Sequence, residues 1–253
     1  MIKIVFPTDE HHPYVDWRAL SVARQITKDF EPDIRFAGSD GVDFYSISKF
    51  DKDPELFRNG LQDELDSWTT AQELWIDVSP GAKVYFLVGN HEDRLRKYLW
   101  KNPELHGLRA LKFESLFRFK ELGIKMADCE GKEQNFYNQL VVKHGDVVRK
   151  YSGYTARAEL EKEMYHISTL SGHTHRGGHV MVTTRTGVKQ AVEGFCLCDT
   201  SPNYLHKPNW QNGLVLATVD RKGVQFELIP FHKDNKGQIS AKWRGGNYES
   251  KRD

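Results

Sequence analysis

The sequence is poor in the features that mark exported, membrane-spanning and strongly basic proteins. Its three cysteines, Cys129, Cys196 and Cys198, are too few and too odd in number for a disulfide framework. No apolar run approaches the roughly 18 to 20 residues that a membrane span needs, and the start MIKIVFPTDEHH is unlike a signal peptide. Lys and Arg number 36 against 35 Asp and Glu, so bulk charge gives no argument for nucleic-acid binding. We expect a cytoplasmic protein in a reducing compartment, without a membrane partner.

Cys196 and Cys198 flank Leu197 in an apolar segment, where a strand would direct both thiols to one face. The sequence contains no second thiol pair that would complete a metal-ligand set. We therefore expect two small buried side chains rather than a metal site.

The chain of 253 residues is 39% apolar, which is enough to build a core. No internal repeat or Pro-, Gly- or Ser-rich linker divides it, so we expect one domain over 1–253, with the polar end 241–253 frayed. Short apolar and β-branched runs predict strands at 2–6, 33–38, 83–89, 138–143, 166–172, 179–187, 188–198 and 213–220. Helical periodicity predicts helices at 16–30, 53–75, 92–100, 113–122 and 155–165. The early alternation of strands and helices indicates a layered α/β fold, and the last third predicts strands joined by turns.

Polar side chains of one kind follow five of the predicted strands. In chain order these are Asp9 and His11, Asp40 and Asp43, Asn90 and His91, then His144, and finally His173 and His175. In an open α/β sheet the carboxyl ends of the strands form the rim where ligands bind. The five segments are therefore predicted to meet in one crevice.

The chemistry of this set is that of a metal site with oxygen and nitrogen ligands. Imidazoles and carboxylates without thiolates favour Mn, Fe, Zn or Mg. The set offers more ligands than one ion needs: Asp9, His11, Asp40, Asn90, His144, His173 and His175. Two ions about 3.5 to 4 Å apart would use them, would lower the pKa of a bound water and would clamp the oxygens of an in-line displacement, as phosphoester hydrolysis requires. His91 is left over and is a candidate general acid for the leaving oxygen.

The ordered set resembles the calcineurin-like metallophosphoesterases, whose pattern is D-x-H, G-D-x-x-D, G-N-H-E/D, a lone His, and G-H-x-H. Here the corresponding residues are Asp9-Glu10-His11, Ser39-Asp40-Gly41-Val42-Asp43, Gly89-Asn90-His91-Glu92, His144 and Gly172-His173-Thr174-His175. The match covers residues 9 to 175 in the family's order. Each motif is weak alone, but the ordered set is specific.

The resemblance implies a role for each matched residue. Asp9, His11 and His175 would hold the first metal; Asn90, His144 and His173 would hold the second; and Asp40 would bridge them. His91 would assist the leaving group while a metal-bridging hydroxide attacks phosphorus, and Asp43 would orient a ligand. The implied cofactors are two divalent ions, Mn foremost, with Fe, Zn, Mg or Ni as alternatives. The implied fold is a two-sheet β-sandwich flanked by helices.

Two features depart from the family pattern. Ser39 stands where the second motif usually has Gly, which is unfavourable if the backbone there has positive φ. Asp43 is followed by Phe44 rather than by the Asp-Arg-Gly ending of the protein Ser/Thr phosphatases, which disfavours a phosphoprotein substrate. The stretches after Asp43 and from Asn209 to Gly213 resemble phage and prophage members of the family.

Several further residues have open interpretations. His12 is placed to support the ligands, and Arg176 to position a substrate phosphate. Asn90 would equally cap the helix predicted from Glu92. The loop 199–212 mixes aromatic and basic residues and would either stack a nucleotide base or pack its aromatics inward. The segment 103–128 has the position of a cap over the site.

Three functions are consistent with these residues. The first is a two-metal phosphodiesterase acting on nucleic acid, favoured by basic residues near the last motifs. The second is a phosphomonoesterase or small nucleotide phosphohydrolase with the same site, favoured by the near-neutral charge, because nucleases gain affinity from many phosphate contacts. The third is a non-catalytic module that binds another protein. It is disfavoured by His91, which no ligand role requires.

Overall fold

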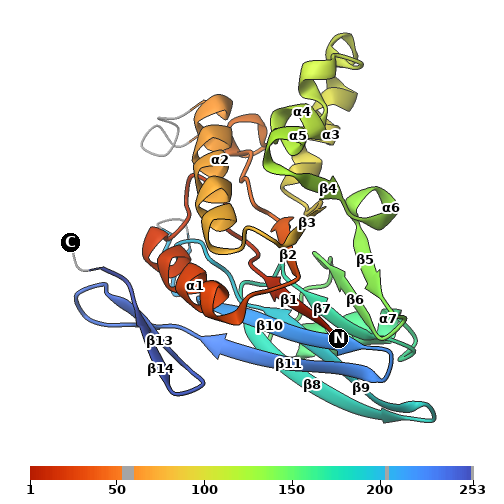
Figure 1. The fold of residues 1–253 in the computed structure, drawn as a ribbon. Coiled ribbons are helices and arrows are strands. Elements are labelled where there is room, and N and C mark those ends of the chain that lie inside the picture. Colours follow the sequence, from red (N-terminus) through yellow and green to blue (C-terminus); the bar gives the residue numbers. More distant parts are fainter. Residues whose placement is uncertain (53–59, 203–204, 252–253) are drawn as a thin grey trace.

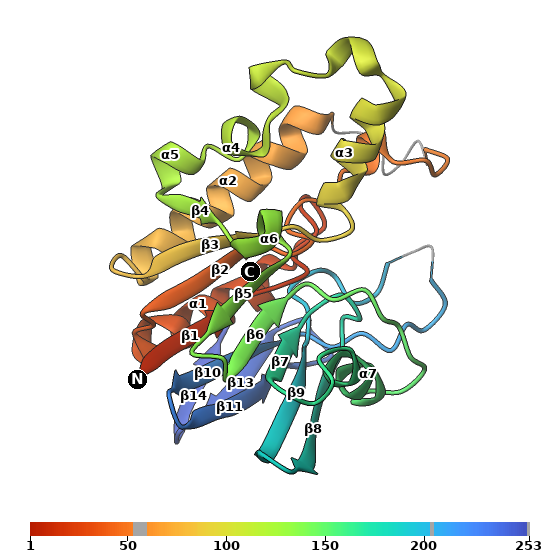
Figure 2. The same cartoon turned by 90° about the vertical axis from the view of Figure 1, so that its right-hand side faces the viewer.

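Two β-sheets lie face to face in the computed structural model, which describes residues 1–52, 60–202 and 205–251 (Figures 1 and 2). The first sheet has six strands in the order β11-β10-β1-β2-β3-β4. Their bounds are β1 Ile2–Phe6, β2 Ile34–Gly38, β3 Lys83–Leu87, β4 Ile124–Met126, β10 Gly213–Asp220 and β11 Gly223–Pro230. Strands β1 to β4 run parallel, and the hairpin β10–β11 adds to β1 in antiparallel fashion.

The second sheet has five strands in the order β5-β6-β7-β9-β8. Its strands are β5 Glu133–Phe136, β6 Leu140–Lys143, β7 Ser168–Ser171, β8 Gly177–Thr184 and β9 Gly187–Gly194. Here β6, β7 and β9 are parallel, with an antiparallel strand at each edge. Side chains from both sheets share one apolar core, in which Ile4, Phe6 and Phe36 of the first sheet meet Val142 and Leu170 of the second. This is the sandwich that the sequence resemblance implies.

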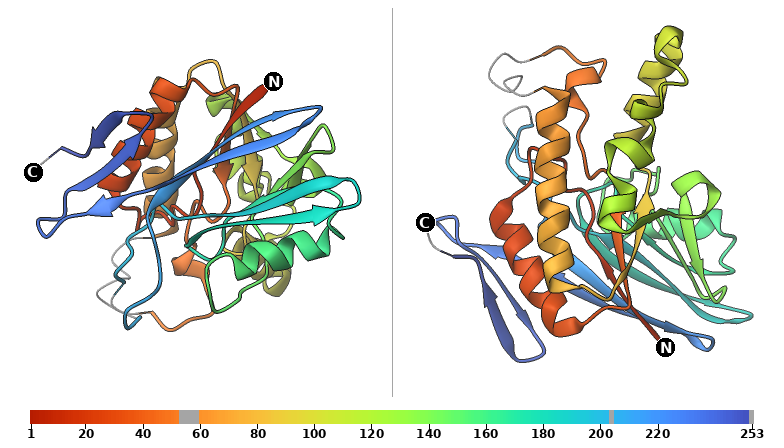
Figure 3. Two further views of the ribbon diagram at one scale, coloured as in Figure 1. Left: turned by 90° about the horizontal axis from the view of Figure 1, so that it is seen from below. Right: turned by 45° about the horizontal axis from the view of Figure 1, so that its top comes forward.

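Helices cover the outer faces of the sandwich. The outer face of the first sheet carries α1 (Trp17–Phe30) and α2 (Leu61–Val78), which lie side by side in Figure 3. Against the second sheet packs α7 (Tyr154–Lys162), through Ala156 and Leu160. Strand β3 is followed by helix α3 (Glu92–Lys101) and by the short helices α4 (Phe113–Leu116) and α5 (Phe119–Leu122). The short helix α6 (Asp128–Gly131) precedes β5. Among the described residues no helix is both long and apolar enough to cross a bilayer.

The second half of the predicted cap 103–128 is instead part of the core beside β3, whereas none of residues 103–112 is buried. Phe113, Phe117 and Phe119 of this segment are buried against Phe86 and Trp68 in one aromatic cluster. No residue of 103–128 lines the large cavity described below. The single helix predicted over 113–122 is broken in two at Arg118, whose φ of 48° lies outside the helical region.

The prediction of a frayed C-terminal end is wrong for the residues that the structure describes. Strands β13 (Ile239–Trp243) and β14 (Gly246–Glu249) form an antiparallel hairpin, and β12 (His232–Lys233) completes a three-stranded sheet. Ile239, Ala241 and Trp243 are buried against α1, beside which the hairpin lies in Figure 3. Alternate residues of this segment are therefore apolar and face inward, although its composition is mostly polar. The expected single domain stays a prediction.

The strands predicted from 2–6 to 213–220 all have counterparts: 2–6 and 213–220 have the predicted bounds, and the ends of the others are shifted by at most four residues. The largest difference is at 188–198, where β9 ends at Gly194 and Phe195 to Cys198 leave the sheet. The helix predicted over 53–75 begins at Leu61 in the structure, and 53–59 lie outside the described residues.

Candidate metal centre

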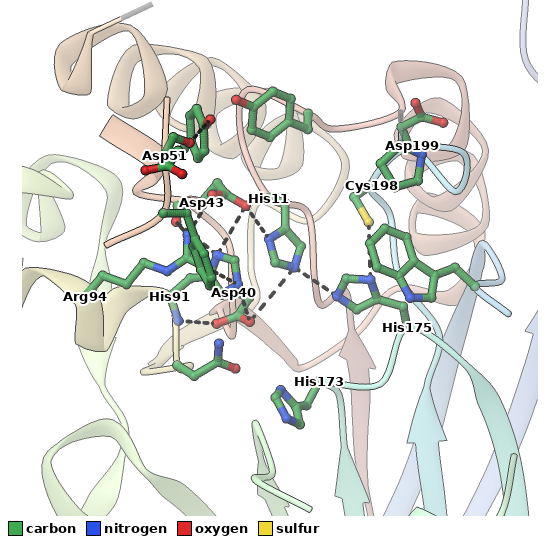
Figure 4. Close-up of a pocket in the computed structure, with 16 residues that line it drawn as sticks. His11, Asp40, Asp43, Asp51, His91, Arg94, His173, His175, Cys198 and Asp199 are labelled. Carbon is green, nitrogen blue, oxygen red and sulfur yellow. Dashed lines mark hydrogen bonds and ion pairs between the residues drawn. The ribbon is translucent and has the colours of Figure 1, made fainter. Parts of the chain in front are cut away.

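Five loops bring the predicted ligands together at the carboxyl ends of the parallel strands of both sheets. The loops after β1, β2 and β3 come from the first sheet, and those after β6 and β7 come from the second. We call the seven residues that they carry the ligand cluster: Asp9, His11, Asp40, Asn90, His144, His173 and His175. Residues far apart in the chain make direct contact here: His11 with His175, and Asp9 with the amide of His173 and the ring of His175, each pair being more than 160 residues apart (Figure 4). The expectation that the five segments meet in one crevice is confirmed.

The residues expected to hold the first metal form one compact group. Ligand atoms of Asp9, His11 and His175 all lie within 4.8 Å of one another. The Nε2 atoms of His11 and His175 face each other at 3.0 Å, and Asp9 Oδ1 lies 3.2 Å from His175 Nε2. All three side chains are buried.

The residues expected to hold the second metal form an adjoining group. Asp40, His144 and His173 again place their ligand atoms within 4.8 Å of one another. His144 Nε2 lies 3.2 Å from Asp40 Oδ2, 3.2 Å from His173 Nδ1 and 3.0 Å from Asn90 Oδ1. Asp40 Oδ2 is also 3.9 Å from His11 Nε2, so this carboxylate lies between the two groups, where a bridging ligand would have to be.

The cluster concentrates charge away from water. Burial would raise the pKa of Asp9, but hydrogen bonds with His11 and His175 hold it well below its usual value. Burial would also raise the pKa of Asp40, and His144 and His91 hold it down instead. Burial alone would lower the pKa of His144, but Asp40 raises it to about 9. Without metal ions, protonated imidazole therefore supplies the positive charge beside the carboxylates of Asp9 and Asp40.

Asp43 connects the ligand cluster to His91. Its Oδ2 lies 3.0 Å from His11 Nδ1 and 3.2 Å from His91 Nδ1, and its Oδ1 accepts from Arg94 Nη1 at 2.8 Å. Asp43 thus fixes the ring of a predicted ligand from behind, as expected from the sequence. His91 also contacts the backbone carbonyl of Asp43 through Nδ1 at 2.9 Å. Its Nε2 is 3.0 Å from Arg94 Nη2 and 3.8 Å from Asp40 Oδ2.

The backbone of the cluster is held in an uncommon conformation. Asp9, His11, Asp40, His173 and His175 all have φ between 50° and 74°, in the left-handed region. Each such residue costs roughly 1 to 3 kcal/mol and persists where the surrounding structure enforces it. This concentration of strain at one place is typical of a functional site.

Two glycines allow the loops to approach this closely. A β-carbon at Gly89 would overlap Oδ1 of Asp40, and one at Gly172 would overlap Thr8 Oγ1 and Asp9 Oδ2. The glycines of the third and fifth motifs are therefore explained by space rather than by turn geometry, because neither has positive φ.

Three further residues, Thr8, Ser39 and Glu92, support the ligands in the structure. Ser39, the departure from the family pattern, does have positive φ, but its hydroxyl lies 2.9 Å from His144 Nδ1 and 2.8 Å from Thr8 Oγ1. Thr8 in turn donates to Asp9 Oδ2 at 2.7 Å. The buried carboxylate of Glu92 accepts from the backbone amides of Asp40, Gly41 and Gly89, which ties two ligand loops together. The Glu of the third motif was the available signal for this role.

Two predicted residues lie away from the ligand cluster. His12 contacts Ser67 Oγ through Nδ1 and Glu10 Oε2 through Nε2, on the opposite side of its loop. Arg176 is buried and donates to the backbone carbonyls of Arg149 and Lys150 at 2.6 and 2.9 Å. Neither lines the cavity over the cluster, so the structure does not bring them to the site. Asn90 faces His144 with its side chain, and the residue at the N-cap of α3 is His91, without a side-chain cap bond.

A cavity of about 640 Å³ opens over the ligand cluster. Its floor is made by cluster residues with Asp43, His91 and Arg94, and its walls include the aromatic residues Tyr14, Tyr45, Phe50 and Trp210. The indole of Trp210 packs against the ring of His175, with centroids 4.2 Å apart. The volume is that of a small-molecule pocket. In the loop 199–212, Trp210 therefore faces the site, and Tyr204 lies outside the described residues.

The donor chemistry of the cluster fits metal cations. Ring nitrogens of different histidines face each other at 3.0 and 3.2 Å with buried carboxylates beside them. Cations would satisfy these converging lone pairs together, and nitrogen and oxygen donors suit Mn, Fe or Zn. The supporting bonds from Asp43 to His11 and from Ser39 to His144 are of the kind that orients metal-binding histidines.

Comparison with known proteins leaves the family open. No family model matches the chain, and no curated protein matches it. Among solved structures, Vps29 from Chaetomium thermophilum is similar at 10% identity and a TM-score of 0.49, over 100% of this chain and 97% of that one. A single mutant of Vps29 from Entamoeba histolytica is similar at 9% identity and a TM-score of 0.43, over 98% and 97%. Both scores are below 0.5, so the likeness adds nothing to what the strands, helices and loops of this chain show by themselves.

Proposed function

We propose that the protein is a binuclear metal-dependent phosphoester hydrolase. The observation that carries this proposal is the pair of adjoining ligand groups, Asp9/His11/His175 and Asp40/His144/His173, with Asp40 within 4 Å of histidines from both. Two divalent ions held there would lower the pKa of bound water and offset the negative charge of a phosphoryl group. Mn²⁺ is the ion that we propose first.

The residues beside the ligand cluster have separate tasks in this proposal. Asp43 orients His11 and His91. His91 lines the cavity next to Asp40. Its Nε2 would carry a proton and donate it to the leaving oxygen. Because Arg94 Nη2 lies 3.0 Å from this atom, the guanidinium would have to move to the substrate phosphate before His91 could donate.

The favoured substrate is a phosphodiester that carries a planar base, as in nucleic acid. Support comes from the aromatic walls of the cavity, since rings of this kind stack bases, and from Arg94 on its floor. A small nucleotide or a phosphomonoester is the second candidate, supported by the limited volume of about 640 Å³. A relation to phage enzymes and a cytoplasmic location remain proposals from the sequence.

Three substrates separate these candidates. Bis-p-nitrophenyl phosphate, p-nitrophenyl phosphate and labelled single- and double-stranded DNA are incubated with Mn²⁺ and, in parallel, with chelator. We expect Mn²⁺-dependent cleavage of the diester and of DNA. A clear preference for the monoester with DNA left intact would overturn the nuclease assignment and favour the second candidate. Absence of turnover on all of these substrates, despite bound Mn²⁺, would favour a non-catalytic module.

His91→Ala tests the assignment of the proton-holding group. We expect kcat on the diester to fall roughly 100-fold or more, the usual loss for a general acid, with Mn²⁺ binding retained. Substrates with progressively poorer leaving groups should be affected more strongly. Unchanged turnover would show that the role given to His91 is wrong.

A further inference from the structure

A second group of potential ligands lies directly behind the ligand cluster. His175, Cys196 and Cys198 place a ring nitrogen and two sulfurs within 4.8 Å of one another, and all three side chains are buried. The Nε2 of His175 faces Asp9 and His11, whereas its Nδ1 lies 3.8 Å from Cys198 Sγ. The two nitrogens of one ring thus face two different groups. Figure 4 shows the sulfur of Cys198 next to the His175 ring.

The backbone that carries the two thiols is fixed on both sides. The amides of Leu197 and Cys198 donate to the carbonyl of Asp9 at 3.2 and 3.1 Å. Asn212 Nδ2 donates to the carbonyls of Cys196 and Cys198 at 3.2 and 2.8 Å, and it lies 3.9 Å from Cys196 Sγ. The thiols are therefore held in place before any ion binds. Asn212 also offers a donor to the sulfur that would become a thiolate.

The spacing suits one shared ion. With metal–sulfur and metal–nitrogen bonds of about 2.3 and 2.0 Å, tetrahedral or trigonal coordination places the two donors roughly 3.5 to 3.8 Å apart. The 3.8 Å between His175 Nδ1 and Cys198 Sγ is at the upper end of this range. Thiolate ligands select soft or borderline ions over Mn²⁺ and Mg²⁺. His175 and Cys198 both line the cavity, which provides a route of entry.

We propose that His175 Nδ1, Cys196 and Cys198 form a separate sulfur-containing site for one soft or borderline cation of the Cu⁺, Zn²⁺ or Cd²⁺ class. Binding releases two thiol protons to solvent, and no oxidation takes place. The expectation that these cysteines are only small buried side chains overlooked His175, which comes from another loop. With Nδ1 of His175 bound to this ion, the single proton of the neutral imidazole is on Nε2, the nitrogen that faces Asp9 and His11. Nε2 can then bind a divalent ion only if a third proton is released, so the site opposes loading of the ligand cluster.

Metal titration of the chelator-treated protein tests the site without any substrate. Cd²⁺ is added while ultraviolet difference absorption records thiolate-to-metal charge transfer. We expect the wild type to show this band, saturating at one thiolate-bound ion per chain. Cys129→Ser is the matched control, because Cys129 is exposed and is not part of the group of His175, Cys196 and Cys198, and it should keep the band unchanged. Asp40→Asn should also keep it, since Asp40 belongs to the ligand cluster.

Cys198→Ser and Cys196→Ser should each lower the Cd²⁺ affinity, measured from the thiolate band, at least tenfold. Circular dichroism checks that both variants fold. If either variant does not fold, Cys129→Ser decides alone, because its only thiols are Cys196 and Cys198. A wild type that binds Cd²⁺ without a thiolate band overturns the proposal. So does a band that disappears in Cys129→Ser or persists in Cys198→Ser.

The coupling to the ligand cluster has its own measurement. One equivalent of Cu⁺ under anaerobic conditions should raise the Mn²⁺ dissociation constant about fivefold or more in the wild type, followed by electron paramagnetic resonance of free Mn²⁺. The same addition should leave Cys198→Ser unchanged. Equal Mn²⁺ affinity with and without Cu⁺ would overturn the opposition between the sites. The thiolate band is independent of hydrolysis, so failure of the proposed activity and failure of this site are distinguishable.

Discussion

Residues 9 to 12 alternate between two buried polar regions on opposite sides of one loop. Asp9 and His11 face the ligand cluster, while Glu10 and His12 face away from it into a group that we call the Glu10 network: Glu10, His12, Ser67 and Trp75. In this network Trp75 Nε1 donates to Glu10 Oε1 at 2.8 Å, and His12 lies between Glu10 Oε2 at 3.2 Å and Ser67 Oγ at 2.9 Å. Every polar side-chain atom of Glu10 and His12 therefore has a partner from the chain.

The two regions solve the problem of buried charge differently. The Glu10 network has a protein cation beside it, Arg35. Burial lowers the pKa of Arg35 to about 10, and the nearby Glu10 acts in the opposite direction. At the ligand cluster, carboxylates meet ring nitrogens that also face each other, and protonated imidazole, as at His144, supplies positive charge beside Asp40. A buried polar network whose atoms all find hydrogen-bonding partners within the chain stabilises the fold. A network that still lacks a partner for its charge is suited to an external cation.

The largest effect is expected for Asp40→Asn. Loss of the carboxylate shared by both ligand groups should reduce Mn²⁺-dependent diester hydrolysis roughly 1,000-fold or more, which corresponds to several kcal/mol of charge stabilisation. Glu10→Gln is the matched change in the Glu10 network and should leave Mn²⁺ stoichiometry unaltered. Steady-state kinetics and isothermal titration measure both. Equal losses in the two variants would remove the distinction between the regions.

The two states of the ligand cluster should respond to pH in opposite directions. The folded-state pKa of His144 is about 9, above the ordinary 6.5, so its stabilising contribution is complete below pH 6.5 and is lost as pH rises towards 9. His11, whose pKa is also raised, adds in the same direction. The metal-free protein should lose on the order of 3 kcal/mol of unfolding free energy across this window.

Saturation with Mn²⁺ should make the unfolding free energy rise with pH instead of fall, because imidazoles must be deprotonated to bind a metal. Urea unfolding at several pH values, with chelator and with Mn²⁺, measures both curves. His144→Gln should flatten the metal-free curve. Parallel curves with and without Mn²⁺ would show that the ion does not replace protons at this cluster.

An intermediate effect is expected for Trp75→Phe. The change keeps an aromatic ring but leaves Glu10 Oε1 without its donor in a buried place, which should cost about 2 kcal/mol of unfolding free energy. Mn²⁺ affinity and diester hydrolysis should be unchanged, because Trp75 touches no cluster residue in the described part of the chain. A variant that keeps its stability but loses Mn²⁺ binding would contradict the comparison.

The smallest effect is expected for Ser67→Ala. It removes one partner of His12 at a half-buried position and should destabilise the fold by about 1 kcal/mol. Ser39→Ala is its counterpart at the ligand cluster, since it removes the hydroxyl next to His144 Nδ1. That variant should weaken Mn²⁺ binding 10-fold or more, as for other partners of metal-binding histidines. If Ser67→Ala weakened Mn²⁺ binding as much, His12 would belong to the site after all.

Much of the fold was predictable because its central strands are locally encoded. Each parallel strand is a short apolar run followed by a polar turn, and this pattern predicted both the elements and the place where Asp9, Asp40 and His144 meet. The C-terminal hairpin was missed because charged and glycine residues separate its few buried side chains, such as Trp243. The cap role for 103–128 failed because Phe117 finds a partner in Trp68, far away in the chain.

The sequence by itself determined which donors the site contains and in which order the loops supply them. The reason is that strand ends and turns are encoded by short stretches of the chain. Only the tertiary structure decided what each donor faces. It turned His12 towards Ser67, held Arg176 on the carbonyls of Arg149 and Lys150, and brought Cys198 to the second nitrogen of His175. Those contacts arise from the packing of two sheets against each other, and the direction of a side chain across that interface depends on residues that are remote in sequence.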